Sequence, residues 1–162
     1  MGKVINRLSI VFDDPDPNIR QHGWFALKTI YENLGMNDLI NQLGLALENE
    51  NEHIRQGACQ ALARIGQKAA IRDVINHLKI ALGDKSCYLR RYACQALGNM
   101  GGKAATTEVI NRLAIALEDE DDDVRESVYQ VLGKMGERAA TPEVINRLLT
   151  ALGDKSWVAR RH

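Results

Sequence analysis

Apolar residues recur along the chain at helical spacing, in two alternating sets separated by short polar segments. In the best-defined part of the chain, the first set is Val109, Ile110, Leu113, Ala116 and Leu117, and the second is Val124, Val128, Val131, Leu132 and Met135. Steps of one, three and four residues place each set on one face of a helix, whereas a strand would need alternation. The pattern therefore predicts two amphipathic helices that form a hairpin.

Residues typical of helix ends flank these stretches. Thr141-Pro142-Glu143 precedes a first helix, where Thr can accept an unpaired N–H, Pro suits the first helical position and Glu favours the positive end of the dipole. Asp121 to Asp123 stand at the start of a second helix, and Gly136 follows its last apolar residue. We expect Gly66 and Gly101 to end the equivalent helices.

The hairpin is repeated along the whole chain with a period of 35 residues. Copies of a Val-Ile-Asn-Arg-Leu segment begin at Val4, Leu39, Val74, Val109 and Val144, and residues 74–108 match 109–143 at 18 of 35 positions. We expect one array with units of about 1–36, 37–71, 72–106 and 107–141 and a partial unit 142–162. A single hairpin cannot bury its own apolar faces, so stacking of neighbours predicts an all-α solenoid.

Composition and charge add limits to this fold prediction. The 21 Lys and Arg balance 21 Asp and Glu, so the large basic excess that favours nucleic acid or an anionic membrane is missing. We therefore expect neither partner. The three cysteines form no disulfide framework, and no signal-peptide core or membrane-length apolar run is apparent, which predicts a cytoplasmic protein.

A recurrent set of residues identifies the kind of repeat. In the fourth unit it comprises Ala116-Leu117-Glu118-Asp119, then Val124-Arg125, then Leu132-Gly133-Lys134-Met135-Gly136. This pattern resembles the HEAT repeat family, in particular the short bilin-lyase-type (PBS-lyase) repeats, over essentially the whole chain. The resemblance implies an armadillo-like, right-handed superhelix of antiparallel helix pairs and a bacterial protein. Since both ends cut through a unit, we expect a segment of a longer array.

The resemblance also implies a ladder of acid–arginine pairs that ties successive units together. The ladder positions are Asp14, Arg20, Asn49, Arg55, Asp84, Arg90, Asp119, Arg125, Asp154 and Arg160, with Asn49 in place of an acid. A charge-assisted bond between units would hold their spacing. We assign these residues a structural role, because a catalytic residue is rarely needed five times.

The second helices are expected to line the concave face of the array, and their outward positions differ from unit to unit. The predicted partner-binding residues are Trp24, Phe25, Gln56, Gln60, Arg91, Gln95, Glu126, Tyr129 and Gln130. Variation on a fixed scaffold favours a binding face, although free drift of solvent-facing positions is the alternative. Trp24 and Phe25 either anchor a partner or cover one end of the stack, where Tyr31 replaces the glycine of later units.

Two local features have structural explanations. Cys59 and Cys94 share the register of Trp24 and Tyr129 on neighbouring helices, and we interpret them as small residues at the edge of the core. The acidic run Glu118 to Asp123 lacks the glycine and the terminal glutamate of a calcium loop, so we expect a solvated turn. Unit 72–106 carries 6 basic and 2 acidic residues against 4 and 9 in unit 107–141. Opposite charge could hold register or favour self-association, which the solenoid ends also invite.

The functional hypothesis is a non-catalytic scaffold that binds a protein or peptide on its concave face, without a metal or cofactor. The resemblance leaves one alternative, a chromophore-handling subunit like the bilin lyases. HEAT-like deoxyhypusine hydroxylase binds iron with His-Glu pairs, but Gly23 follows His22 and the chain ends at His162. The neutral charge argues against a HEAT-like DNA glycosylase.

Overall fold

The computed structural model describes residue 11 and residues 14–153; within α2 and at the end of α9 several side chains, including that of Trp24, are not described. This part of the chain is a stack of α-helices without a strand, which confirms the all-α prediction. The helices are α2 (Pro17–Leu34), α3 (Met36–Ala46), α4 (Glu52–Ile65), α5 (Arg72–Ala81), α6 (Cys87–Met100), α7 (Thr107–Ala116), α8 (Asp122–Met135) and α9 (Pro142–Gly153).

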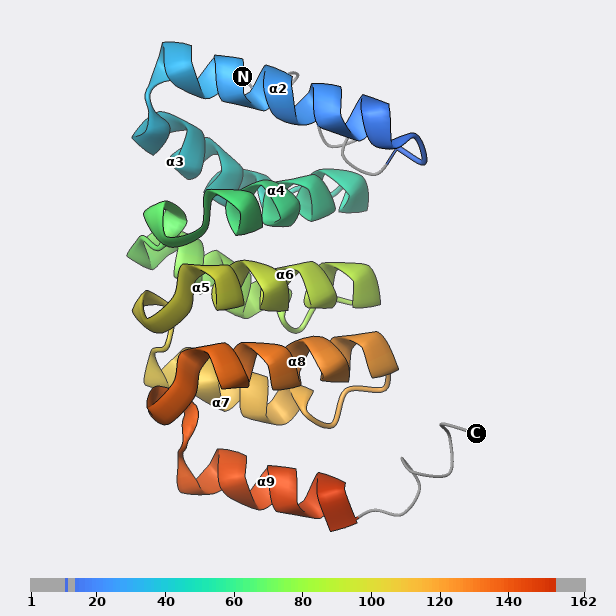
Figure 1. Cartoon of the computed structure of the whole chain (residues 1–162), viewed down its shortest axis with the longest axis vertical. Coiled ribbons are helices and arrows are strands. Elements are labelled where there is room, and N and C mark those ends of the chain that lie inside the picture. Colours follow the sequence, from blue (N-terminus) through green and yellow to red (C-terminus); the bar gives the residue numbers. More distant parts are fainter. Residues whose placement is uncertain (1–10, 12–13, 154–162) are drawn as a thin grey trace.

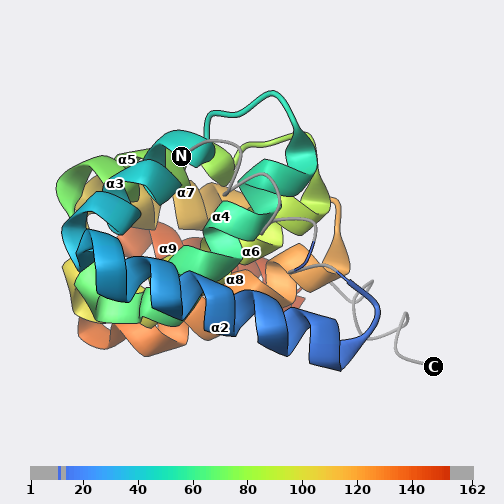
Figure 2. The ribbon, with the colours of Figure 1, turned by 90° about the horizontal axis from the view of Figure 1, so that it is seen from above.

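The helices form two layers. α4, α6 and α8, the second helices of their units, pack side by side and form the second-helix layer. The first helices α3, α5, α7 and α9 form the first-helix layer behind them (Figure 1). Seen along the stack, α3, α5 and α7 lie to one side of α4, α6 and α8 (Figure 2). The described part of the chain is therefore the predicted α-solenoid, in which the second, third and fourth units each contribute one helix to each layer.

Helix ends lie where the sequence predicts them. The side chains of Asn51, Ser86 and Asp121 cap α4, α6 and α8 from equivalent positions. Gly66, Gly101 and Gly136 follow these helices with φ of 61°, 64° and 58°, a region that favours glycine. Tyr31 occupies the corresponding position of the first unit, and α2 continues past it for three more residues to Leu34.

A single hydrophobic core runs the length of the stack. Its buried residues run from Leu39 in the second unit to Val144 in the fifth, and Ala26 and Met36 of the first unit pack against it while partly buried. The first-helix set predicted from the sequence is buried, with Val109 and Leu113 at 0% exposure, and so is the second-helix set, with Val124 and Val128 at 0%. The apolar period therefore identified the core positions correctly.

Candidate functional site

The acid–arginine ladder joins the second-helix layer from unit to unit. Arg90 of α6 binds Asp119 of the next unit through two parallel bonds, Nε to Oδ2 and Nη2 to Oδ1, both 2.7 Å. Arg55 donates one hydrogen bond to Asp84, from Nη2 to Oδ1 at 3.2 Å, and its Nε lies 3.2 Å from Oδ2 as an ion-pair contact only. The bond to Asp119 raises the pKa of Arg90, so this guanidinium stays charged. Both rungs join residues at the ladder positions.

The described ladder arginines also form hydrogen bonds to the turn that precedes their own helix. Arg20, Arg55 and Arg90 donate to the backbone carbonyls of Asp14 (2.6 Å), Asn49 (2.8 Å) and Asp84 (2.9 Å) of their own units. Arg125 donates likewise to the carbonyl of Asp119. The carboxylates of Asp84 and Asp119 each accept the backbone N–H two residues on, at 2.9 and 3.0 Å. One rung therefore fixes both the turn and the spacing of two units.

The ladder is incomplete at the N-terminal end. Asn49 uses its side-chain oxygen to accept the N–H of Asn51, and Arg20 bonds only backbone carbonyls of its own turn within the described residues. Asn49 therefore keeps the turn but does not provide a charged rung. Asp154 and Arg160 lie outside the described residues.

The acidic run forms the expected turn into the start of α8, with Glu118, Glu120, Asp122 and Asp123 exposed, and its carboxylates also pair with arginines. The pairs are Glu118 with Arg147, Asp119 and Glu120 with Arg90, Asp122 with Arg125, and Asp123 with Arg91. Asp121 accepts the N–H of Val124 at 3.0 Å, which lowers its pKa. Basic unit 72–106 thus packs on acidic unit 107–141 through specific bonds.

Most of the predicted binding residues lie on the outer side of the second-helix layer. Gln95, Glu126 and Gln130 are exposed, Gln60 and Arg91 are half-buried, Tyr129 is 41% exposed, and Phe25 is 70% exposed on α2. The backbone of Trp24 belongs to α2. The structure thus places seven of these nine side chains at least partly at the surface.

Gln56 departs from the prediction. It is only 5% exposed, and its Nε2 donates to Glu52 at 3.0 Å. The same Glu52 oxygen accepts the hydroxyl of Ser86 from α6. Gln56 is therefore part of a polar contact between α4 and α6. It is buried because α6 covers this side of α4.

The cysteine row is buried for the same reason. Cys59 and Cys94 have no exposed surface, although a wheel drawn for one unit turns their register away from the core. Burial raises the pKa of the Cys94 thiol to about 12 and that of Cys59 further. The interpretation as small packing residues agrees with this position. Tyr129 shares the register on α8 but remains partly exposed.

One feature of this face escaped the sequence prediction. Arg91 lies over the ring of Tyr88 at 5.7 Å and over that of Tyr92 at 5.3 Å, and its Nη1 contacts Asp123 at 3.2 Å. Tyr88 is 57% exposed. The equivalents of Tyr92 in the units before and after are Gly57 and Ser127, so a comparison of rows could have found this aromatic pair.

Metal binding and membrane insertion can be judged for the described residues alone. Among them no group of three or more His, Cys, Asp or Glu side chains is arranged to hold a metal ion. In the same part of the chain, no helix combines the length and apolarity needed to cross a bilayer.

Comparison with known proteins places these features in a family. A family model described as HEAT repeats matches residues 5–79 and 75–162. No sequence relative is found among curated proteins.

Several solved structures share the fold. The complex of CpcE and CpcF of phycocyanin lyase from Nostoc sp. PCC7120 is similar with a TM-score of 0.66 and 22% identity, covering 95% of this chain and 91% of that one. Human deoxyhypusine hydroxylase gives 0.53 at 21% identity, over 81% of this chain and 43% of that one. A designed armadillo repeat protein in complex with the peptide (KR)4 gives 0.50 at 17% identity, over 88% and 78%.

Proposed function

Since the chain belongs to the HEAT repeat family, we propose that it is a non-catalytic scaffold that binds a protein or peptide on the concave face formed by its second helices. The observation that supports this most is the contrast between the ladder and the outer face. Ladder residues are engaged in bonds within the scaffold, whereas Phe25, Gln95 and Gln130 of the first, third and fourth units are exposed to solvent.

The chemistry of this face suits a polypeptide. A primary amide offers one donor and one acceptor side, which is also what a peptide group offers. Gln60, Gln95 and Gln130 place three amides at the same register of α4, α6 and α8. Together with the balanced net charge, this supports a polypeptide partner over nucleic acid or a membrane. The proposed location is the cytoplasm, which suits the free thiols of Cys59, Cys87 and Cys94.

A matched set of variants tests the face. Phe25→Ala, Gln95→Ala and Gln130→Ala combined remove exposed side chains of α2, α6 and α8. We expect this triple variant to reduce capture of the partner at least about tenfold. Asn41→Ala, Asn111→Ala and Asn146→Ala remove exposed side chains of α3, α7 and α9 and serve as the control. Both variants should unfold at the wild-type temperature. Equal loss of capture in both, or in neither, would overturn the proposal.

A bilin-lyase-like subunit is the second candidate. Its support is the similarity to the complex of CpcE and CpcF of phycocyanin lyase, which covers 95% of this chain and 91% of the matched chain of that complex. Titration with a bilin, followed by its visible absorbance, distinguishes the two functions. Saturable binding of the chromophore would favour the lyase-like subunit, while an unchanged spectrum at tens of micromolar would favour the scaffold.

A further inference from the structure

The first two turns of α6, the turn before α8 and the start of α8 form a surface that is both aromatic and acidic. It comprises Tyr88, Arg91, Glu120, Asp122, Asp123 and Glu126, and we name it the Tyr88 surface. The guanidinium of Arg91 lies 5.7 Å from the centroid of the Tyr88 ring and 5.3 Å from that of the Tyr92 ring and pairs with Asp123, so Tyr88 is supported from within the protein. Its ring is nevertheless 57% exposed.

The charges of this region are layered. The side chains of Arg90, Arg125 and Arg91 are 9%, 24% and 28% exposed, while those of Asp123, Asp122 and Glu120 are 69%, 70% and 87% exposed. The cations therefore lie beneath the carboxylates that they pair with. An approaching molecule meets the carboxylates first, even though each of these three has an arginine partner.

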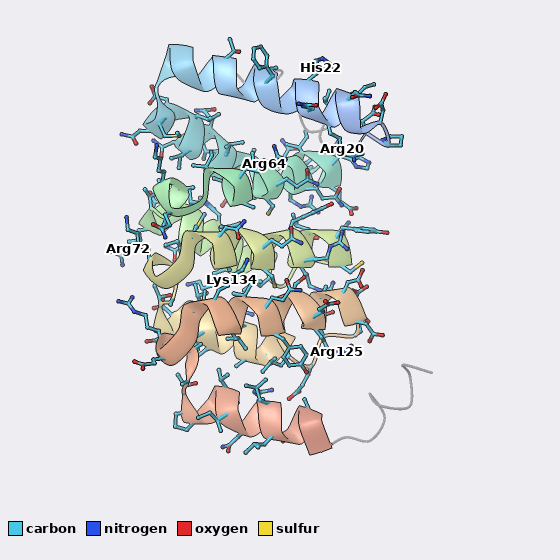
Figure 3. The ribbon with its side chains drawn as sticks, in the orientation of Figure 1. Arg20, His22, Arg64, Arg72, Arg125 and Lys134 are labelled. Atoms are coloured by element: carbon cyan, nitrogen blue, oxygen red, sulfur yellow. The ribbon has the colours of Figure 1, made fainter. Side chains whose placement is uncertain are left out.

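The region also carries an excess of negative charge. Six carboxylates, Asp119 to Asp123 and Glu126, lie with three guanidinium groups, those of Arg90, Arg91 and Arg125. Glu126 is exposed and accepts an amide bond from Gln130 at 3.3 Å rather than an arginine. Lys85, exposed in the turn before α6, adds a fourth cation, so six carboxylates still outnumber four cations. Lys134 is distant along the helix axis, because Lys134 and Arg125 lie near opposite ends of α8 (Figure 3).

We propose that the Tyr88 surface binds a cationic segment of the polypeptide partner, with Lys or Arg side chains against Tyr88 and the exposed carboxylates. An exposed aromatic ring attracts a cation through its face, and carboxylates with buried counter-ions give the outward potential that complements a basic segment. This inference rests on the proposed function, since it names the chemistry of the partner for the same helix layer.

Fluorescence anisotropy with three labelled peptides tests the chemistry of the partner. The peptides are octalysine, octaglutamate and a neutral Gly-Ser octapeptide, measured with the full chain at 50 and 150 mM salt. We expect octalysine to bind most tightly and to weaken with salt. Glu120→Gln with Glu126→Gln should raise its Kd about tenfold, and Tyr88→Ala about threefold.

The control has the same change of charge in the other layer. Asp38→Asn with Asp73→Asn neutralises two exposed carboxylates of α3 and α5, and should leave the Kd for octalysine within about twofold of wild type. Circular dichroism melting of each variant checks that the fold is retained.

The outcomes separate this inference from the function on which it rests. Equal weakening by the two double variants, or no saturable octalysine binding, would overturn the cationic partner. Tighter binding of octaglutamate or the neutral peptide, lost in the Phe25/Gln95/Gln130 variant, would also overturn it while supporting the scaffold function. Loss of octalysine affinity in the Tyr88-surface variants alone would support both.

Discussion

A single ladder carboxylate binds both the backbone of its own turn and the arginine of the preceding unit. Asp119 accepts the backbone N–H of Asp121 and the Nε and Nη2 N–H groups of Arg90, and each side chain of the ion pair is only 9% exposed. Burial of such a pair costs desolvation that its hydrogen bonds must offset, so removal of one partner leaves an uncompensated charge. At the residue scale, the ladder therefore serves mainly to fix the turn and the spacing of neighbouring units, and less to add net stability.

Asp121 should make stability depend on pH. Its pKa is lowered because the ionised carboxylate accepts the N–H of Val124, so the native state is favoured while Asp121 is charged. That stabilisation is complete above the ordinary value of 3.8 and is lost as pH falls through the lower native value. Asp121→Asn keeps the cap without the charge and should cost less than about 1 kcal/mol at pH 7.

Urea unfolding from pH 7 down to pH 2 measures this difference. The free energies of unfolding of wild type and Asp121→Asn should converge as the pH falls below 4. A constant difference over the whole range would show that the charge of Asp121 has no role.

Equivalent positions in different helices have different surroundings. Gly98 of α6 and Gly133 of α8 are 35 residues apart, yet a Cβ on Gly98 would lie 2.9 Å from Val131 Cγ2, while nothing lies within 4 Å of one on Gly133. The difference arises because α6 has α8 against that side. At the scale of the element, the neighbouring helix decides which small residues are required.

The two glycines should respond in opposite directions to alanine. Gly133→Ala should raise the free energy of unfolding by about 0.5–1 kcal/mol through helix propensity. Gly98→Ala should lower it by about 1 kcal/mol or more through overpacking against Val131. Urea denaturation of both variants provides the measurement. A stabilised Gly98→Ala would mean that α8 moves aside at little cost.

The missing rung at Asn49 can be restored. In Asn49→Asp the new carboxylate lies at the register where Asp84 meets Arg55, so Arg20 gains a charged partner. We expect slower hydrogen exchange in α2 and α3 and a gain of about 0.5–1 kcal/mol.

Asn51→Asp is the matched control for the restored rung. It introduces the same charge two residues on, at the cap of α4. Equal protection of α2 in both variants would assign the gain to the charge at the helix start and not to a rung.

The whole molecule is held together by contacts between neighbours. α6 lies between α4 and α8, and Leu89, Ala93, Leu97 and Met100 have no exposed surface. Toward the C-terminal end of the described stack, Ile145 is 46% exposed although its counterpart Ile110 is 4% exposed. Stability should thus be highest in the middle of the described stack.

Native-state hydrogen exchange should reveal this gradient. Amides of α6 should exchange most slowly, and those of α2 and α9 at least about tenfold faster, because these two helices pack against fewer of the described helices than α6 does. Mass spectrometry of peptides after timed labelling measures each helix separately. Uniform exchange rates across the helices would indicate that the array unfolds as one cooperative unit.

The sequence by itself determined the period, the helix pairs, their caps and the core positions, because these depend on local spacing and turn chemistry. Val109, Val124 and Gly136 all have the positions that the repeat predicts. The outer face was determined only in part. Gln95 and Gln130 are exposed as expected, and the function assigned to them remains a proposal.

Only the tertiary structure decided which flank of each second helix is covered. A helical wheel treats one unit at a time, whereas α6 is packed by α5 and by both neighbouring second helices. That is why Gln56, Cys59 and Cys94 are buried, and why Arg91 meets Asp123 from 32 residues away. Local patterns carry no information about such contacts until the angle between successive units is known.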